Sequence, residues 1–317
     1  MGKVLLFGEP MALLIADSVV PLEKVEHFSR SLSGAEVNVC IGLSRLGHMA
    51  TYITRLGDDP FGHFIENYLR KENIGTEFVT YDDIYRTGIQ LKSKVLSGDP
   101  VAPYYRKGSA ASHLTVKEID NIDFSDIQHV HITGIPAALS KGCRDATYRL
   151  FERAKENDVF ITFDPNLRPA LWESKEVMIE TINDLSSKAD MVLPGLQEGK
   201  LLFGIDNIEA IADKYQALGV KQIVIKDGSR GAYVRDGNES YTVKGFKVDK
   251  VVDTVGAGDG FAVGIISARL EGLSLREMVK RGNAIGAIQV TNIGDNEGLP
   301  MPGELKKFMK NKNLNNG

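Results

Sequence analysis

Short apolar runs alternate with longer amphipathic stretches from about residue 127 to residue 299. The apolar runs are 130–133, 160–163, 191–193, 222–225 and 232–234, and the helical patterns lie near 140–157, 175–188, 197–203 and 207–218. Another apolar run, at 4–7, predicts a buried strand near the start of the chain. Strands that alternate with helices are typical of a mostly parallel sheet flanked by helices, which binds ligands at the carboxyl ends of its strands. We expect such an α/β domain over residues 1–317.

Two stretches depart from this alternation. Residues 11–30 have no helical period, which favours short strands and turns. Residues 86–107 alternate apolar with polar positions on either side of Gly98-Asp99-Pro100, and this pattern predicts a β-hairpin. Together the two stretches predict a small inserted β-sheet outside the main layer. Such a sheet would form a lid that keeps water away from a reaction.

A glycine-rich turn at residues 253–260 precedes an almost wholly apolar helix, which begins near Phe261. A helix that opens from such a turn presents unpaired backbone amides and the positive end of its dipole to an anion. Asp259 lies among these amides, where it would repel a phosphate unless it had a task of its own. Holding and deprotonating an attacking hydroxyl is such a task, so the turn predicts phosphoryl transfer. The alternative is an ordinary helix start with an acidic residue in its first turn.

The composition of the chain indicates which partners and which cellular compartment to expect. The chain has 317 residues, a net charge of −4 and 43% apolar residues. A mildly acidic protein is a poor match for nucleic acid or anionic membranes, and no apolar run is long enough to span a bilayer. Cys40 and Cys143 are far apart and belong to no paired motif, which predicts reduced, buried thiols and a cytoplasmic protein.

Three further candidates follow from local pattern, each with a structural alternative. Gly34 permits close approach of a ligand and Asn38 could bind sugar hydroxyls, although an ordinary turn and helix cap explains them equally well. Arg168 stands in a rigid loop between prolines and is suited to a carboxylate, unless it only pairs with the Asp of its own loop. Glu198 follows a predicted strand, where it could serve a metal or simply begin a helix.

The segment Asp253-Thr254-Val255-Gly256-Ala257-Gly258-Asp259 resembles the C-terminal signature of the ribokinase-like (PfkB) sugar kinases. Gly34, Ala35 and Asn38 match the family's first sugar-binding signature. The resemblance spans nearly the whole chain and implies a ribokinase-like fold with ATP as phosphoryl donor. It implies that Asp259 is the catalytic base and that the amides of Gly256, Ala257 and Gly258 form the anion hole.

The same resemblance suggests where the nucleotide and the metal bind. Lys226, Gly228 and Gly231 match the nucleotide-side loop, and Asn283 and Ala287 would lie against the adenine, although their helix equally fits a core helix. Glu198 matches a residue that orders Mg²⁺ and its waters, but Gly195 stands where relatives usually carry Asn. A monovalent cation near Asp253 is common among relatives.

Residues of the lid point to a sugar acid. Tyr104, Arg106 and the segment 108–111, taken with Arg168, look most like the 2-keto-3-deoxygluconate kinases. A tyrosine hydroxyl and two guanidinium groups could clamp a carboxylate that a neutral sugar lacks. The alternative for the lid residues is an edge with a solvated basic pair.

Two further positions bear on the sugar. Asp295 matches a sugar-contacting position of this subgroup, whereas Gln90 stands where some relatives carry Tyr. We expect ATP-dependent phosphorylation of the 6-hydroxyl of 2-keto-3-deoxygluconate by a homo-oligomer that associates through the lid. The alternatives are fructokinase and, from a different class, a non-catalytic sugar or nucleotide sensor.

Overall fold

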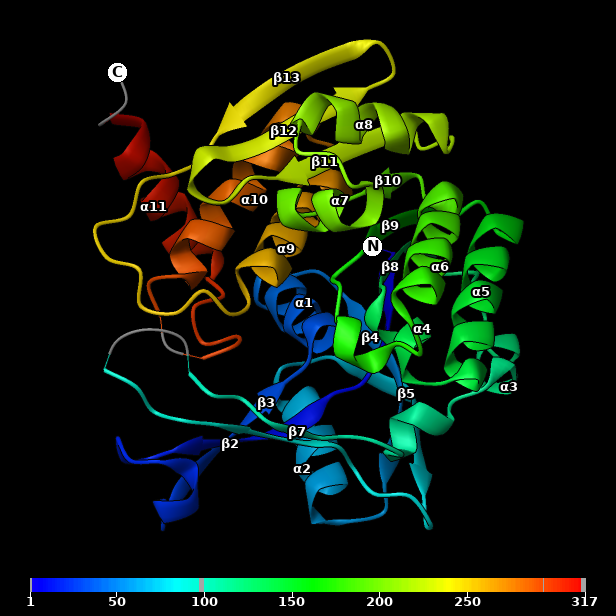
Figure 1. Cartoon of the computed structure of the whole chain (residues 1–317), viewed down its shortest axis with the longest axis vertical. Coiled ribbons are helices and arrows are strands. Elements are labelled where there is room, and N and C mark those ends of the chain that lie inside the picture. The colour runs from blue at the N-terminus through cyan, green and yellow to red at the C-terminus, as the bar shows by residue number, and fades with distance from the viewer. Residues whose placement is uncertain (1, 97–99, 293, 315–317) are drawn as a thin grey trace.

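A computed structural model describes residues 2–96, 100–292 and 294–314 (Figure 1). Its main sheet has nine strands in the order β13-β12-β11-β10-β9-β8-β1-β4-β5. In chain order these are β1 (Lys3–Phe7), β4 (Ala50–Gly57), β5 (Gly75–Asp82), β8 (Ile127–Thr133), β9 (Phe160–Asp164), β10 (Met191–Val192), β11 (Gln222–Lys226), β12 (Gly231–Asp236) and β13 (Glu239–Lys244). All neighbours from β5 to β11 are parallel, and β12 and β13 are antiparallel. The mostly parallel sheet is therefore confirmed.

Helices cover both faces of this sheet because its strands are apolar on both sides. In β1, Leu5 and Phe7 belong to one core, whereas Val4 and Leu6 belong to the other. The first core is covered by α3 (Val116–Asp120), α4 (Ile135–Leu139), α5 (Lys141–Glu156), α6 (Lys175–Lys188), α7 (Leu196–Phe203) and α8 (Ile208–Ala217). The second is covered by α1 (Ala35–Arg45), α2 (Pro60–Lys71), α9 (Ala257–Leu270), α10 (Leu275–Gln289) and α11 (Pro302–Leu314).

A second, smaller sheet forms the predicted lid, which lies below the main sheet in Figure 1. Its strands are β3 (Phe28–Ser33), β2 (Met11–Ala16), β6 (Ile89–Lys92) and β7 (Tyr104–Tyr105), in that spatial order. Strand β6 pairs parallel to β2 and antiparallel to β7. Gly98 and Asp99 of the predicted hairpin turn lie outside the described residues. The inserted β-sheet of the predicted fold class is thus confirmed.

Some elements had no clear sequence signal. Strands β5 and β13 are the edges of the main sheet, where β5 is only partly buried and β13 is mostly exposed, so neither contains a long apolar run. The polar residues 306–314 belong to helix α11. Cys40 and Cys143 are free and buried, as predicted. Within the described residues, no helix is long and apolar enough to cross a membrane.

Candidate active site

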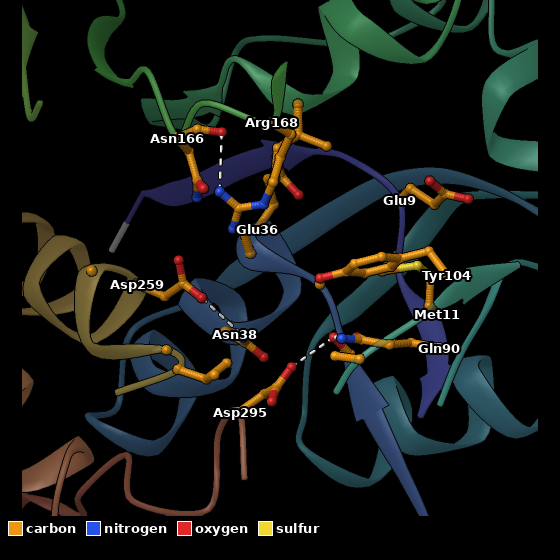
Figure 2. Close-up of a pocket in the computed structure, with 18 of the residues that line it drawn as sticks. Glu9, Met11, Glu36, Asn38, Gln90, Tyr104, Asn166, Arg168, Asp259 and Asp295 are labelled. Carbon is orange, nitrogen blue, oxygen red and sulfur yellow. Dashed lines mark hydrogen bonds between the residues drawn. The ribbon is translucent and has the colours of Figure 1, made fainter. Parts of the chain in front are cut away.

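A cavity of about 500 Å³ opens between the carboxyl ends of the main-sheet strands, the lid and the first turn of α9. Figure 2 shows Asp259 and Arg168 facing it from the main domain and Gln90 and Tyr104 facing it from the lid. Of the predicted site residues, those that line the cavity are Gly34, Ala35, Asn38, Gln90, Tyr104, Arg106, Arg168, Glu198, Lys226, Gly256, Gly258, Asp259 and Asp295. One cavity therefore brings together residues from both family signatures and from the lid.

The first turn of α9 has the geometry of an anion site. Gly256 precedes the helix with φ +76°, and a Cβ on it would lie 2.2 Å from the carbonyl oxygen of Asp295, so this position requires glycine. No side chain caps the helix. Among the described residues, the amides of Gly258 and Asp259 have no acceptor, whereas that of Ala257 lies 3.4 Å from the carbonyl oxygen of Thr254. These open amides and the helix dipole favour a phosphate.

Asp259 has an environment that suits a general base. Burial raises the pKa of its carboxyl to about 7, and the nearby carboxylate of Asp164 adds to the rise. The side-chain amide of Asn38 opposes this shift by donating a hydrogen bond of 2.8 Å to Oδ2. Asn296 donates to Oδ1 of Asn38, and this contact fixes which end of the Asn38 amide faces Asp259. A base with a pKa near 7 is well matched to proton removal at neutral pH.

A second carboxyl, that of the buried residue Glu36, lies on the same helix as Asn38 and also lines the cavity. It accepts a hydrogen bond from the hydroxyl of Thr133, at the end of β8. Burial raises the pKa of Glu36 to about 7, against the opposing effect of that bond. The cavity therefore contains two carboxyl groups that change charge near neutral pH.

Arg106 lies in the cavity wall, but its guanidinium is already paired. Its Nε lies 2.7 Å from Oε2 of Glu9, which is fully buried and also accepts a hydrogen bond from Ser109. The ring of Tyr104 lies beside the same guanidinium, 5.7 Å from it. The charge of Arg106 is thus balanced within the protein, and one edge of its guanidinium is engaged.

Arg168 differs from the other cations of the cavity. Its Nη1 donates to the backbone carbonyl of Leu167 at 2.9 Å, and Figure 2 shows the weaker contact to the carbonyl of Asn166. Among the described residues it has no carboxylate partner, whereas Lys92, Arg106 and Lys226 all do. Arg168 is therefore a lining cation that can pair with an anionic ligand.

Glu198, in the first turn of α7, lies close to Lys226, the last residue of β11. Glu198 accepts hydrogen bonds of 2.7 Å from the amides of Leu167 and Gly195, so the backbone of Gly195 orients it although no Asn side chain is present. Lys226 pairs with Asp164. Within the described residues no group of three His, Cys, Asp or Glu side chains could hold a metal ion. The carboxylate of Glu198 is an oxygen donor of the kind that Mg²⁺ prefers.

Four of the predicted nucleotide-side residues do not line the cavity: Gly228, Gly231, Asn283 and Ala287. Ala257 of the predicted anion hole does not line it either. The side-chain amide of Asn283 donates to the carbonyls of Val243 and Lys244, at 3.0 and 3.2 Å, and so ties α10 to β13. Gly231 has φ +105°, and a Cβ there would lie 2.1 Å from the carbonyl oxygen of Val243. Both residues have structural tasks in this region, and their contact with a nucleotide stays a prediction.

Several lining residues were not identified from the sequence. The polar ones include Glu9, Ser33, Glu36 and Lys92. Lys92 alone had a usable signal, because it stands two residues after Gln90 on a strand and therefore points to the same face. Glu9 and Glu36 lie in segments whose sequence gives no sign of their burial.

A helix start with open amides, a half-buried carboxyl beside it and a small sheet over the cavity form the geometry expected of a phosphotransferase that acts on a small hydroxyl compound. The model of the pfkB family carbohydrate kinases matches residues 1–302, and the chain belongs to this family.

Several relatives of known name resemble the chain over nearly its full length. It is 46% identical over 304 residues to a 2-dehydro-3-deoxygluconokinase of Bacillus subtilis (strain 168), covering 96% of this chain and 94% of the relative. It is 35% identical to an enzyme of the same name from Thermoproteus tenax, covering 98% and 95%. Fructokinase-1 of Zea mays is 32% identical, covering 97% of each chain. Of these three relatives, the fructokinase has the lowest sequence identity to the chain.

Solved structures agree with this fold. A PfkB protein from Polaromonas sp. JS666 superposes with a TM-score of 0.88 at 43% identity, covering 96% of this chain and 99% of the other. A fructokinase from Vibrio cholerae O395 with fructose, ADP and potassium superposes with a TM-score of 0.86 at 26% identity, covering 97% and 98%. A ribokinase II structure from E. coli with ATP and Mg²⁺ has a TM-score of 0.88 at 26% identity, covering 98% and 100%. The ribokinase-like fold is confirmed.

Proposed function

We propose that this carbohydrate kinase transfers the γ-phosphoryl group of ATP to the 6-hydroxyl of 2-keto-3-deoxygluconate (2-dehydro-3-deoxygluconate). The product is 2-keto-3-deoxy-6-phosphogluconate. The observation that carries the proposal is Asp259, a half-buried carboxyl with a pKa of about 7 directly beside the open amides of α9. The names of the two 2-dehydro-3-deoxygluconokinases support the choice of sugar.

In the proposed reaction, Asp259 accepts a hydrogen bond from the sugar hydroxyl and takes its proton as the oxygen attacks. A bond forms between that oxygen and the γ-phosphorus, while the bond from the phosphorus to ADP breaks. The amides at the start of α9, together with that of Gly256, stabilise the charge on the transferring group. Asn38 holds the carboxylate of Asp259 in position through its 2.8 Å hydrogen bond.

The preference for a sugar acid rests on Arg168. It lines the cavity without a carboxylate partner among the described residues, so a substrate carboxylate can pair with it. Arg106 would present its remaining edge to the same group, beside the hydroxyl of Tyr104. Gln90, Asp295 and Gly34 are proposed to contact the sugar from the lid and from the start of α1.

Magnesium is the proposed metal, and when bound it would neutralise charge on the phosphates of ATP. Glu198 is proposed to orient its waters, because both oxygens of its carboxylate are fixed by backbone amides. Lys226 lies 3.5 Å from where a Cβ on Gly258 would be, so its ammonium stands beside the anion site and would supplement this charge. A requirement for a monovalent cation stays a prediction.

Association through the lid also stays a prediction. Its support is a set of exposed apolar side chains on the lid, which would be covered in an oligomer. They include Leu96, Val101, Tyr104 and Tyr105.

The test is a coupled ADP-release assay with 2-keto-3-deoxygluconate, its galactonate epimer, fructose and ribose. We expect the highest kcat/KM with one of the two sugar acids. A higher kcat/KM with fructose would favour the fructokinase alternative, whose support is the similarity to known fructokinases. Binding of the nucleotide without release of ADP in the presence of any of these sugars would instead favour the non-catalytic sensor.

A further inference from the structure

A lysine of the lid makes a buried contact with the phosphate-binding turn of the main domain. Lys92, the last residue of β6, places its ammonium 2.7 Å from Oδ2 of Asp253 and 3.2 Å from Oδ1 of Asp295. The three side chains are only 5%, 9% and 5% exposed, so water screens this cluster weakly.

The two carboxylates that Lys92 joins both shape the start of α9. Oδ1 of Asp253 accepts a hydrogen bond of 3.0 Å from the amide of Val255, and so fixes the peptide just before Gly256. The backbone oxygen of Asp295 packs against Gly256, whose missing Cβ would lie 2.2 Å from it. The position of the anion site therefore depends on both aspartates.

Asp295 also extends the contact back into the lid. Its Oδ2 lies 2.6 Å from the hydroxyl of Ser33, at the end of β3, and that hydroxyl lies 2.6 Å from the amide oxygen of Gln90. Lid strands β3 and β6 thus meet the phosphate side of the cavity through one small polar cluster, which we define as Ser33, Gln90, Lys92, Asp253 and Asp295. Without the ammonium of Lys92, this cluster would contain two buried carboxylates and no cation.

We propose that Lys92 is a positioning residue that couples the lid to the anion site, so that the γ-phosphate of ATP is held well only while Lys92 bridges Asp253 and Asp295. The inference rests on the proposed phosphoryl transfer, because it takes the amides at the start of α9 as the γ-phosphate site. It predicts that loss of the Lys92 charge lowers the affinity for a nucleotide that has a γ-phosphate and does not lower the affinity for one that lacks it.

The test compares the affinities of the purified protein for a non-hydrolysable ATP analogue and for ADP, both with Mg²⁺. Lys92→Met removes the charge and keeps most of the side-chain volume. We expect it to weaken binding of the ATP analogue by roughly 10- to 100-fold, in the range of a coupling between two sites, and to leave ADP binding within about threefold. Lys94→Met is the matched control, because Lys94 is an exposed lysine of the lid whose ammonium donates to the carbonyl of Asp17.

Unchanged binding of the ATP analogue to Lys92→Met, or an equal loss for both nucleotides, would overturn the inference. If that variant does not fold, Asp253→Asn replaces it, since it removes the carboxylate through which Lys92 acts, and the same selective loss is expected. Failure of the proposed function would look different, because the unmodified protein would then release no ADP with any sugar or would bind neither nucleotide.

Discussion

Removing the hydrogen bond from Asn38 to Asp259 should move the pH dependence of catalysis. The bond favours the charged form of the carboxyl and so lowers its pKa, while burial raises the pKa to a final value of about 7. Asn38→Ala keeps the burial and removes the opposing effect. The pKa of Asp259 should therefore rise, and less of the base should be ionised at pH 7.

The size of the shift follows from the strength of the bond. A hydrogen bond to a charged group contributes about 1.5–3 kcal/mol, and 1.36 kcal/mol corresponds to one pKa unit. We therefore expect the pKa of Asp259 to rise by roughly one to two units in Asn38→Ala. Since the ionised form is the base, activity should appear on the alkaline side of this pKa in both proteins.

The assay is kcat/KM for the sugar acid, measured from pH 5.5 to 9.5 by ADP release. The acid limb of the unmodified enzyme should fall near pH 7, and that of Asn38→Ala should lie at higher pH. Asn157→Ala, at the exposed end of α5, is the control for substitution as such. An acid limb that stays in place while the rate falls equally at every pH would refute this role of Asn38 and leave it a sugar contact only.

Four other substitutions test the cavity and the turn. Arg168→Ala should raise KM for the sugar acid by roughly 10- to 100-fold, which corresponds to the loss of a charge-assisted hydrogen bond, and should change KM for fructose little. An equal rise of KM for both sugars would contradict the pairing of Arg168 with the substrate carboxylate. Arg106→Ala leaves the buried carboxylate of Glu9 without its cation. We therefore expect a lower melting temperature and a lower kcat/KM with both the sugar acid and fructose. Gly256→Ala should lower the melting temperature, since the left-handed backbone alone costs about 1–2 kcal/mol and its Cβ would meet a backbone oxygen. Gly258→Ala should melt near the unmodified protein, because its Cβ has room, and equal melting of the two glycine variants would refute the account.

Local signals explain why much of the fold could be predicted. Helix α6 runs from Lys175 to Lys188 as expected, because Ser174 caps its first turn and its apolar face repeats with a helical period. The edge strand β5 could not be found in this way. It has no fully buried residue, and its pairing with β4 is set by contacts distant in sequence.

The same distinction holds in the cavity. Asp259 could be identified because its glycines are its neighbours in the chain. The partner of Arg106 is Glu9, 97 residues earlier, and Lys92 meets Asp253 across 161 residues. No local pattern indicates such pairs. Only the fold distinguishes the paired guanidinium of Arg106 from that of Arg168.

The most direct measurement of the central claim is the turnover of Asp259→Asn together with its affinity for the sugar. Asn has nearly the same size and can still contact the hydroxyl, but it cannot take the proton. We predict that kcat falls by about 10²- to 10⁴-fold, as for other lost acid–base groups, while calorimetry shows sugar binding within a few-fold of the unmodified enzyme. Near-normal turnover in a variant that binds the sugar would contradict the claim that Asp259 is the base.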